Sequence, residues 1–241
     1  MKETPAAFPL PSGALAIMKR IGEAGGRCVV VGGAVRDVLR GEKPEDVDLA
    51  SSLPPEKVVS LFSDCRLILD GEKHGTVGIL WDGEIFEVTS FRRDGDYPDR
   101  RHPAEVTFTG SLEEDLRRRD FTVNAMAWSP ETGLVDPFGG KRDLEEGLLR
   151  AVGDPGKRFG EDSLRILRLL RFLSTLGFRA EEETGRAARR LAPALETVSG
   201  ERIARELEKL LAGPAAARVL REYREIASLL LGEYQTPRAL T

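Results

Sequence analysis

The stretch CVVVGGAVRDVLRGEKPEDVDLASSL, residues 28–53, joins an apolar run that ends in two glycines to two aspartates one residue apart. The run 27–31 predicts a strand, and the helical spacing that follows the glycines predicts a helix. Gly32 and Gly33 would leave backbone N–H groups free at the helix N-terminus, with no Cβ to keep a phosphate away. The turn therefore indicates a phosphate site, to which Arg36 adds a cation. Taken alone, two glycines at this place favour a plain tight strand-to-helix turn, so a second element is needed.

Asp46 and Asp48 supply a second element of the same site. We predict a strand over residues 46–50, on which positions i and i+2 project to one face. Two carboxylates so close repel each other unless a cation lies between them. Few, hard oxygen ligands suit Mg²⁺, which keeps waters and shares substrate phosphates. An aspartate pair facing water is the alternative, but glycines and aspartates together indicate a nucleoside triphosphate with its metal.

Two other nucleotide-binding motifs fit this stretch poorly. A Rossmann turn needs G-x-G-x-x-G and one carboxylate about 20 residues on, whereas here the glycines are adjacent and the acids form a D-x-D pair. A Walker loop is excluded because G-x-x-x-x-G-K-[ST] does not occur.

Composition places the chain among ordinary globular proteins. It has 241 residues, 41% of them hydrophobic, and 36 Lys+Arg against 40 Asp+Glu give a net charge of only −4. No global field attracts it to nucleic acid or membrane, so any basic surface must be local. Cys28 and Cys65 are expected to be reduced thiols, and the absence of a long apolar run leads us to expect a cytoplasmic protein with no membrane partner.

The chain changes character near Gly153. Before it, we expect a mixed sheet with helices; the Asp82-Gly83 pair predicts a hairpin between two of its strands. Residues 92–103 predict a mobile loop, or else a plain solvated connection. After it, three segments carry helical spacing, namely 161–178, 181–195 and 200–211. Residues from about Gly232 read as a fraying end. The other expected helices are 12–24, one opening at Ala34 and 54–62, and the other expected strands lie within 66–71, 76–83 and 84–91.

Four motifs occur in a fixed order between residues 29 and 211: GGAVRD with DVDLA, RRRDFTVNAMA, DPFGGKRDL and EDSLRILRLLRF. This set resembles class II tRNA nucleotidyltransferases, the CCA-adding enzymes and bacterial poly(A) polymerases of the polymerase-β superfamily. The resemblance implies an α+β fold, with a polymerase-β-like nucleotidyltransferase head over 1–152 and an all-α neck over 153–241. Longer members of the family continue through body and tail domains, and we expect these to be absent from this chain, which departs from the family in its length.

The resemblance assigns metal ligands. Asp46 and Asp48 would hold two Mg²⁺ ions, one activating the primer 3′-hydroxyl and the other steadying the pyrophosphate. Glu87 matches a third carboxylate of the family, although a strand glutamate facing solvent is an equal alternative.

The resemblance also assigns a ribose motif to Arg119, Asp120 and Asn124. A carboxylate beside a guanidinium can bind the ribose hydroxyl that DNA precursors lack, which implies ribonucleotide selection. The alternative is an aspartate that caps a helix and pairs with a neighbour.

The last motif predicts a helix that begins at Glu161. Its polar stripe at i, i+3 and i+6 consists of Asp162, Arg165 and Arg168, amid so many apolar residues that part of the stripe should be buried and need a partner. A base could be that partner: Asp162 would accept from the exocyclic amino group of C or A while Arg165 donates to the ring nitrogen. G and U present the reverse pattern, at a cost of about 1–3 kcal/mol per mismatched group. A solvated amphipathic face is the alternative.

We therefore predict template-independent addition of CMP and AMP from CTP and ATP to the 3′ end of tRNA. The segment FRRDGDYPDRRHPAEVTF, residues 91–108, resembles the family's flexible loop and favours full CCA addition over a CC-adding enzyme. An A-adding enzyme, a poly(A) polymerase and a non-catalytic RNA- or nucleotide-binding module remain the alternatives. Arginines of the helical region could contact phosphates: 179, 186, 189, 190, 202 and 205.

Overall fold

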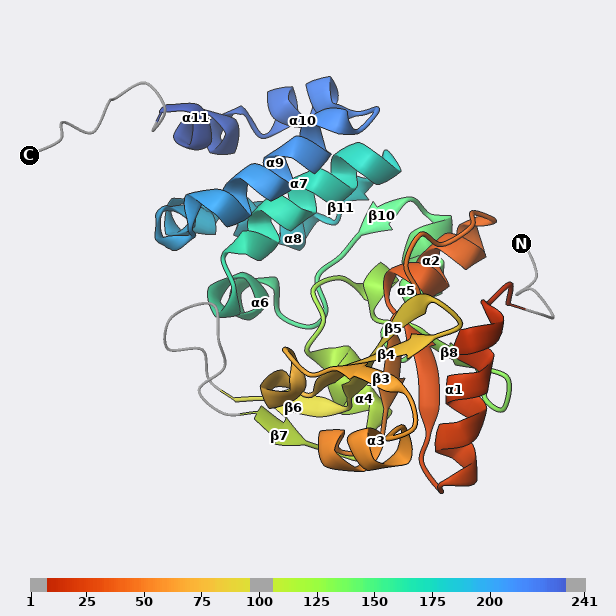
Figure 1. Ribbon diagram of the computed structural model, residues 1–241. Coiled ribbons are helices and arrows are strands. Elements are labelled where there is room, and N and C mark those ends of the chain that lie inside the picture. The colour runs from red at the N-terminus through yellow and green to blue at the C-terminus, as the bar shows by residue number, and fades with distance from the viewer. Residues whose placement is uncertain (1–7, 96–105, 233–241) are drawn as a thin grey trace, which may run out of the picture. The chain divides into compact units, whose positions relative to one another are not determined.

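The structure is a computed structural model that describes residues 8–95 and 106–232 (Figure 1). The described backbone forms two compact units. The first comprises the described parts of 8–95 and 106–145, and the second comprises 146–232. None of the helices in the described ranges is long and apolar enough to cross a membrane.

The first unit is built on a mixed sheet. Its strands lie in the order β3-β4-β5-β2-β1-β8-β9, and β2 runs parallel to β5 while the other neighbours are antiparallel. Val29 of the apolar β1 pairs with Ala50 of β2, so the two halves of the opening stretch are adjacent strands. The bounds are β1 Cys28–Val31, β2 Leu49–Ser51, β3 Arg66–Ile68, β4 Thr76–Trp81, β5 Glu84–Ser90, β8 Ala127–Ser129 and β9 Gly133–Val135.

Helices cover this sheet because their apolar faces match its buried residues. Ile17 and Ile21 of α1 join Val30, Leu49 and Val88 in one fully buried cluster. Figure 1 shows α1 lying along the sheet beside β8. The helices of the unit are α1 Ser12–Glu23, α2 Gly33–Arg40, α3 Pro55–Leu61, η1 Glu72–His74, α4 Leu112–Arg117, η2 Thr122–Asn124 and α5 Gly140–Glu145; a separate ribbon pairs β6 Arg92–Asp94 with β7 Val106–Phe108.

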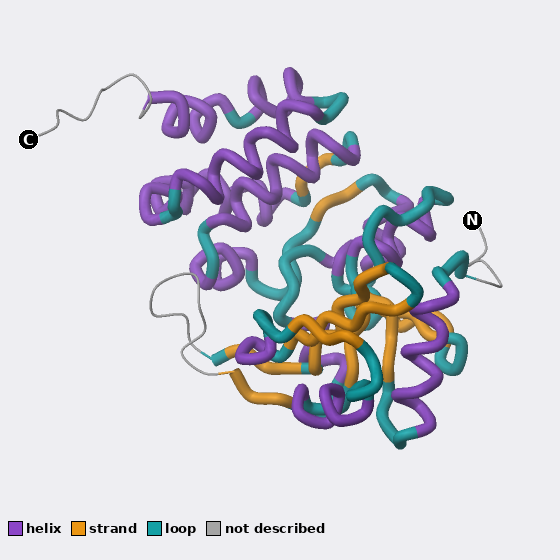
Figure 2. Tube along the Cα trace, viewed as in Figure 1, coloured by secondary structure: helices purple, strands orange, loops and turns teal. Residues whose placement is uncertain are grey.

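The second unit is almost entirely helical, as the tube in Figure 2 shows. Helix α7 is buried along most of its length and packs against α9, so its apolar circumference forms the core of the unit. Its helices are α6 Pro155–Glu161, α7 Leu164–Leu176, α8 Glu182–Leu191, η3 Ala192–Thr197, α9 Gly200–Ala212, α10 Ala216–Glu222 and α11 Arg224–Gly232, and β10 Leu148–Leu149 pairs with β11 Arg179–Ala180.

The fold class is confirmed: a mixed sheet with helices is followed by a helical region. The hairpin at Asp82-Gly83 is also confirmed, since β4 and β5 pair around it and both residues have positive φ, 48° and 86°. The roles expected for the segments 1–152 and 153–241 stay predictions.

Three expectations about single elements are wrong. The strand expected over 46–50 begins only at Leu49, because the pairing of β2 with its neighbour β5 starts there and Asp46 lies in the loop before it. The loop expected from residue 92 begins as strand β6, which β7 pairs. The all-helical character expected after 155 is interrupted by β11. The rest of that loop, 96–105, and the end expected to fray, 233–241, lie outside the described residues.

Candidate active site

The turn between β1 and α2 has a backbone that requires glycine. Gly32 has φ 70° and ψ −128°, a conformation that side chains with a Cβ rarely adopt. Its N–H donates to the Met126 carbonyl at 3.2 Å, and its own carbonyl accepts from Arg36 N at 3.2 Å. The Gly32 amide is therefore occupied, and the amides that face an anion are those that begin at Gly33, the first residue of α2.

The two aspartates lie beside this turn. The Asp48 carbonyl accepts from Val31 N at 3.1 Å, which ties the segment before β2 to the end of β1. Asp46 and Asp48 are both exposed and line one open pocket of about 990 Å³ in the first unit. The glycine turn and the aspartate pair are thus held together by the ladder between two adjacent strands.

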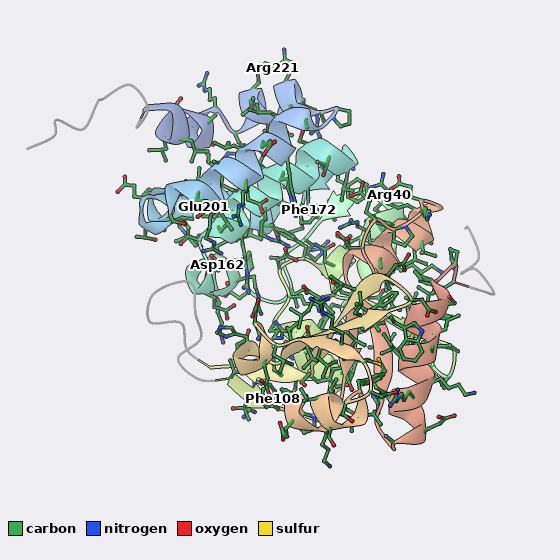
Figure 3. The ribbon with its side chains drawn as sticks, viewed as in Figure 1. Arg40, Phe108, Asp162, Phe172, Glu201 and Arg221 are labelled. Carbon is green, nitrogen blue, oxygen red and sulfur yellow. The ribbon has the colours of Figure 1, made fainter. Side chains whose placement is uncertain are left out.

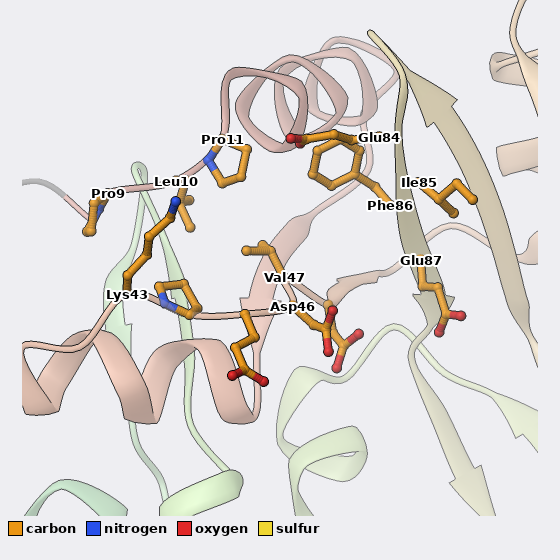
Figure 4. A pocket seen from close by; sticks show the side chains of 13 residues that line it. Pro9, Leu10, Pro11, Lys43, Asp46, Val47, Glu84, Ile85, Phe86 and Glu87 are labelled. Carbon is orange, nitrogen blue, oxygen red and sulfur yellow. The ribbon is translucent and has the colours of Figure 1, made fainter.

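Glu87 joins the aspartates through the parallel pairing of β2 and β5. Leu49 pairs with Val88, so Asp48 and Glu87 are the residues directly before the first pair of this ladder. Neighbouring strand backbones lie about 4.8 Å apart, which keeps these two positions close. Glu87 lines the same pocket as Asp46 (Figure 4), and Gly78, its partner on β4, has no side chain to cover it.

Burial and two charged neighbours set the pKa of Asp48. Burial of its carboxyl group raises the pKa of Asp48, the charge of Arg119 opposes this rise, and the charge of Asp46 adds to it. Much of the Asp48 residue is exposed, so the shift reflects the immediate surroundings of the carboxyl group and carries little free energy. Asp46 and Asp48 are therefore close enough to repel, which a cation between them would relieve.

Arg119 forms an ion pair with Asp115, a residue that the sequence analysis missed. Asp115 has a fully buried side chain and accepts from Arg118 Nη2 at 2.8 Å and Arg119 Nη2 at 3.3 Å. Burial opposes ionisation of Asp115, but the charges of Arg118 and Arg119 outweigh it and lower its pKa. The i+3 and i+4 spacing of the two arginines from Asp115 could have indicated these pairs.

The Arg119 side chain reaches over the glycine turn. A Cβ built on Gly32 would lie 3.0 Å from Arg119 Nη1, and burial lowers the pKa of Arg119. Its Nε is buried and has no hydrogen-bond partner among the described residues. Arg119 Nη1 therefore places a donor beside the turn.

Asn124 and Asp120 form a chain of hydrogen bonds with Arg36. Asn124 Oδ1 accepts from Arg36 Nη1 at 2.7 Å, and Asn124 Nδ2 donates to Asp120 Oδ1 at 3.1 Å. The other edge of the Arg36 guanidinium donates to Asp37, through Nε at 2.8 Å. The structure therefore brings the expected triphosphate and ribose residues into one network, in which Arg36 positions Asn124.

The donor set fits a divalent metal that is completed by substrate. Among the residues described, no three His, Cys, Asp or Glu side chains converge as a complete metal site. A repelling pair of carboxylates with exposed oxygens is nevertheless suited to Mg²⁺, which takes its remaining ligands from water and phosphates.

In the second unit the predicted base-recognition helix is broken. We expected one helix from Glu161, but α6 ends there and α7 begins at Leu164, so Asp162 lies in the junction with φ −144° and ψ 106° (Figure 3). The reason is local: Asp162 Oδ1 accepts from Leu164 N at 3.1 Å, which closes a turn just before α7, whose N-cap residue is Ser163. Asp162 Oδ2 accepts from Arg202 Nη2 at 2.9 Å.

The two arginines of the expected stripe have partners in the protein. Arg165 is only 11% exposed and donates through Nη1 to Glu161 at 2.8 Å and to the Arg158 carbonyl at 3.0 Å. Arg168 lies 4.0 Å from Glu206 and over the ring of Phe172. The buried charge that sequence reasoning required to be paired is therefore paired by Glu161.

Other arginines of the helical region also pair with acids. Arg202 holds Asp162, while Arg186, Arg189 and Arg205 pair with Glu182, Glu225 and Glu201. Their expected phosphate contacts stay predictions.

Comparisons with known proteins identify relatives of this chain. A model of the poly A polymerase head domain matches residues 28–150, and a model of the probable RNA and SrmB-binding site of polymerase A matches 177–227. A CCA-adding enzyme of Geobacillus thermodenitrificans is 48% identical over 207 residues, which are 86% of this chain and 51% of that enzyme.

Two solved structures are similar. The Bacillus stearothermophilus CCA-adding enzyme in complex with CTP matches with a TM-score of 0.79 and 45% identity, over 86% of this chain and 50% of that one. The Thermotoga maritima CCA-adding enzyme complexed with tRNA matches with a TM-score of 0.74 and 29% identity, over 89% of this chain and 50% of that one. The chain thus spans about half the length of the curated relatives it matches.

Proposed function

Because the chain belongs to the poly(A) polymerase head-domain family, we propose that it transfers CMP and AMP from CTP and ATP to the 3′ end of tRNA. The observation that carries the proposal is the placement of Asp46, Asp48 and Glu87 beside the glycine turn, which suits a triphosphate with its metal. The relatives crystallised with CTP and with tRNA support the same substrates.

In this reaction the first unit binds the triphosphate. The amides from Gly33 onward donate to phosphate oxygens, and the positive end of α2 favours their charge. Asp46 and Asp48 would hold Mg²⁺, with Glu87 next to them; the metal supplies activation of the 3′-hydroxyl and neutralisation of the pyrophosphate. The new bond joins the 3′-oxygen to the α-phosphorus, and pyrophosphate leaves.

Ribose and base are read by polar side chains that are already oriented. Asp120 and Asn124 are fixed by hydrogen bonds, so they can accept from and donate to a 2′-hydroxyl without reorganising. Asp162 and Arg165 offer an acceptor and a donor, which match the amino group and ring nitrogen of C and A. Arg168 belongs to the same polar stripe as Asp162 and Arg165. We assign the reaction to the cytoplasm.

The test is extension of a tRNA that ends at the discriminator base, with Mg²⁺ and CTP or ATP singly and together. Two added residues with CTP, and a third only when ATP is also present, are the expected result on a sequencing gel. ATP-only incorporation into long products would instead make the chain a poly(A) polymerase. No extension under any condition would reduce it to a binding module, and Asp48→Ala is the inactive control.

A further inference from the structure

The Asp162 carboxylate is held at both oxygens. Oδ1 accepts from Leu164 N at 3.1 Å, and Oδ2 accepts from Arg202 Nη2 at 2.9 Å. The two side chains of the ion pair are 17% and 23% exposed, so the pair is mostly screened from water. Rotation of the carboxylate would break both contacts, and its orientation is therefore fixed from two directions.

The position of Arg202 is unfavourable for the stability of its own helix. It lies in the first turn of α9, where the positive end of the helix dipole disfavours a cation. Its partner Asp162 is 40 residues away in sequence and lies at the junction of two other helices. Arg205, one turn later, pairs within α9 with Glu201 and is 72% exposed, as expected for a solvated surface arginine.

We propose that Arg202 is a positioning residue for base selection, which acts through Asp162 on the edge of the incoming nucleotide. This inference rests on the proposed function. Arg202 takes one acceptor direction of Oδ2 and leaves the remaining lone pairs of Asp162 in one orientation. An ionised carboxylate accepts and cannot donate, so it binds the exocyclic amino group of C and A.

The consequence is that discrimination depends on Arg202 as well as on Asp162. A carboxylate that is free to rotate can turn away from the carbonyl of U or G and avoid the repulsion that excludes them. Without Arg202, the penalty against the wrong base should therefore fall more than the rate of the chemical step. A residue that merely stabilised α9 would lower all activities equally.

The experiment measures kcat and KM for CTP and UTP on a tRNA that lacks its CCA end, with Arg202→Ala, Arg202→Lys and the matched control Arg205→Ala. We expect the ratio of kcat/KM for CTP over UTP to fall about tenfold in Arg202→Ala, mainly through a lower KM for UTP. Arg202→Lys should restore part of the ratio, because it returns the charge without the planar fork. Arg205→Ala should keep the parent ratio and the parent melting temperature.

A double-mutant cycle separates positioning from stability. In an Asp162→Asn background, Arg202→Ala should change the CTP over UTP ratio no further, because its route to the base has already been removed. A parent-like ratio in Arg202→Ala, or an equal fall in Arg205→Ala, would overturn the inference. If Arg202→Ala does not fold, the Arg202→Lys ratio decides, and a fully parental value overturns it. Failure of the parent to extend tRNA at all would instead refute the proposed function.

Discussion

The substitution Gly33→Ala separates a phosphate site from a plain turn. Gly33 is the first residue of α2, and a Cβ built there has Arg36 Nη2, at 3.5 Å, as its nearest neighbour, an ordinary contact. The folded protein can therefore accept the methyl group. Gly to Ala at a compatible position removes disorder from the unfolded chain and stabilises by about 0.4–1 kcal/mol. If a phosphate approaches this backbone, the same methyl group must weaken the binding of that phosphate.

The expected loss is that of a hydrogen bond to an anion, about 1.5–3 kcal/mol or roughly ten- to a hundredfold in Kd. Gly32→Ala is the matched comparison, because its φ of 70° and a Cβ 3.0 Å from Arg119 Nη1 introduce strain of about 1–3 kcal/mol. Calorimetric titration with CTP and Mg²⁺ gives the affinity, and thermal unfolding without nucleotide gives the stability. Gly33→Ala should thus be stable but bind weakly, and Gly32→Ala should be unstable. If a stable Gly33→Ala variant binds CTP with the affinity of the parent, the phosphate site is refuted and the two glycines form only a tight turn.

Three further predictions follow from buried groups. Because the pKa of Asp48 is raised, the folded protein favours the neutral form of this carboxyl group. Asp48→Asn should therefore stabilise the protein by less than about 1 kcal/mol at pH values above that pKa, while extension activity falls on the order of a thousandfold. A variant that is less stable than the parent, or one that is active, would contradict this. Asp115→Asn should lower the free energy of unfolding by about 3 kcal/mol at neutral pH. Since the pKa of Asp115 is lowered in the folded protein, the difference in stability between parent and variant should shrink as the pH falls through that pKa. Urea unfolding at neutral and acid pH measures both values, and a difference that does not change with pH would contradict the prediction. Burial raises the pKa of Cys28 to about 12, so mass spectrometry after brief alkylation at pH 8 should find Cys28 modified only in unfolded protein, and rapid native modification would disprove its burial.

Sequence periodicity was sufficient for the elements whose pattern is local. Helix α1 begins at Ser12 and ends one residue before the expected position, and β4 and β5 turn at the Asp-Gly pair whose positive φ values the residue types allow. The adjacency of β1 and β2, however, depends on pairing between segments that lie some twenty residues apart, which no local pattern fixes.

In the polar sites, too, local contacts could be predicted from the sequence and contacts between distant segments could not. The i, i+2 spacing of Asp46 and Asp48 predicted their proximity from a strand that begins only at Leu49, so their common place is shown by the pocket that both line. The position of Glu87 near Asp48 required the parallel pairing of β2 with β5. In the helical unit, the amphipathic spacing continues through Asp162, although the side chain of that residue bonds to the backbone N–H of Leu164 in a turn that separates α6 from α7. Its partner Arg202 could not be predicted, because the contact joins residues 40 apart.

The most direct test of the account is a crystal structure of the chain with CTP and Mn²⁺ in place of Mg²⁺, with anomalous scattering to locate the metal. We predict an anomalous peak within bonding distance of both Asp46 and Asp48, with the triphosphate against the amides that begin at Gly33. A nucleotide bound elsewhere, or a peak that neither carboxylate contacts, would contradict the account.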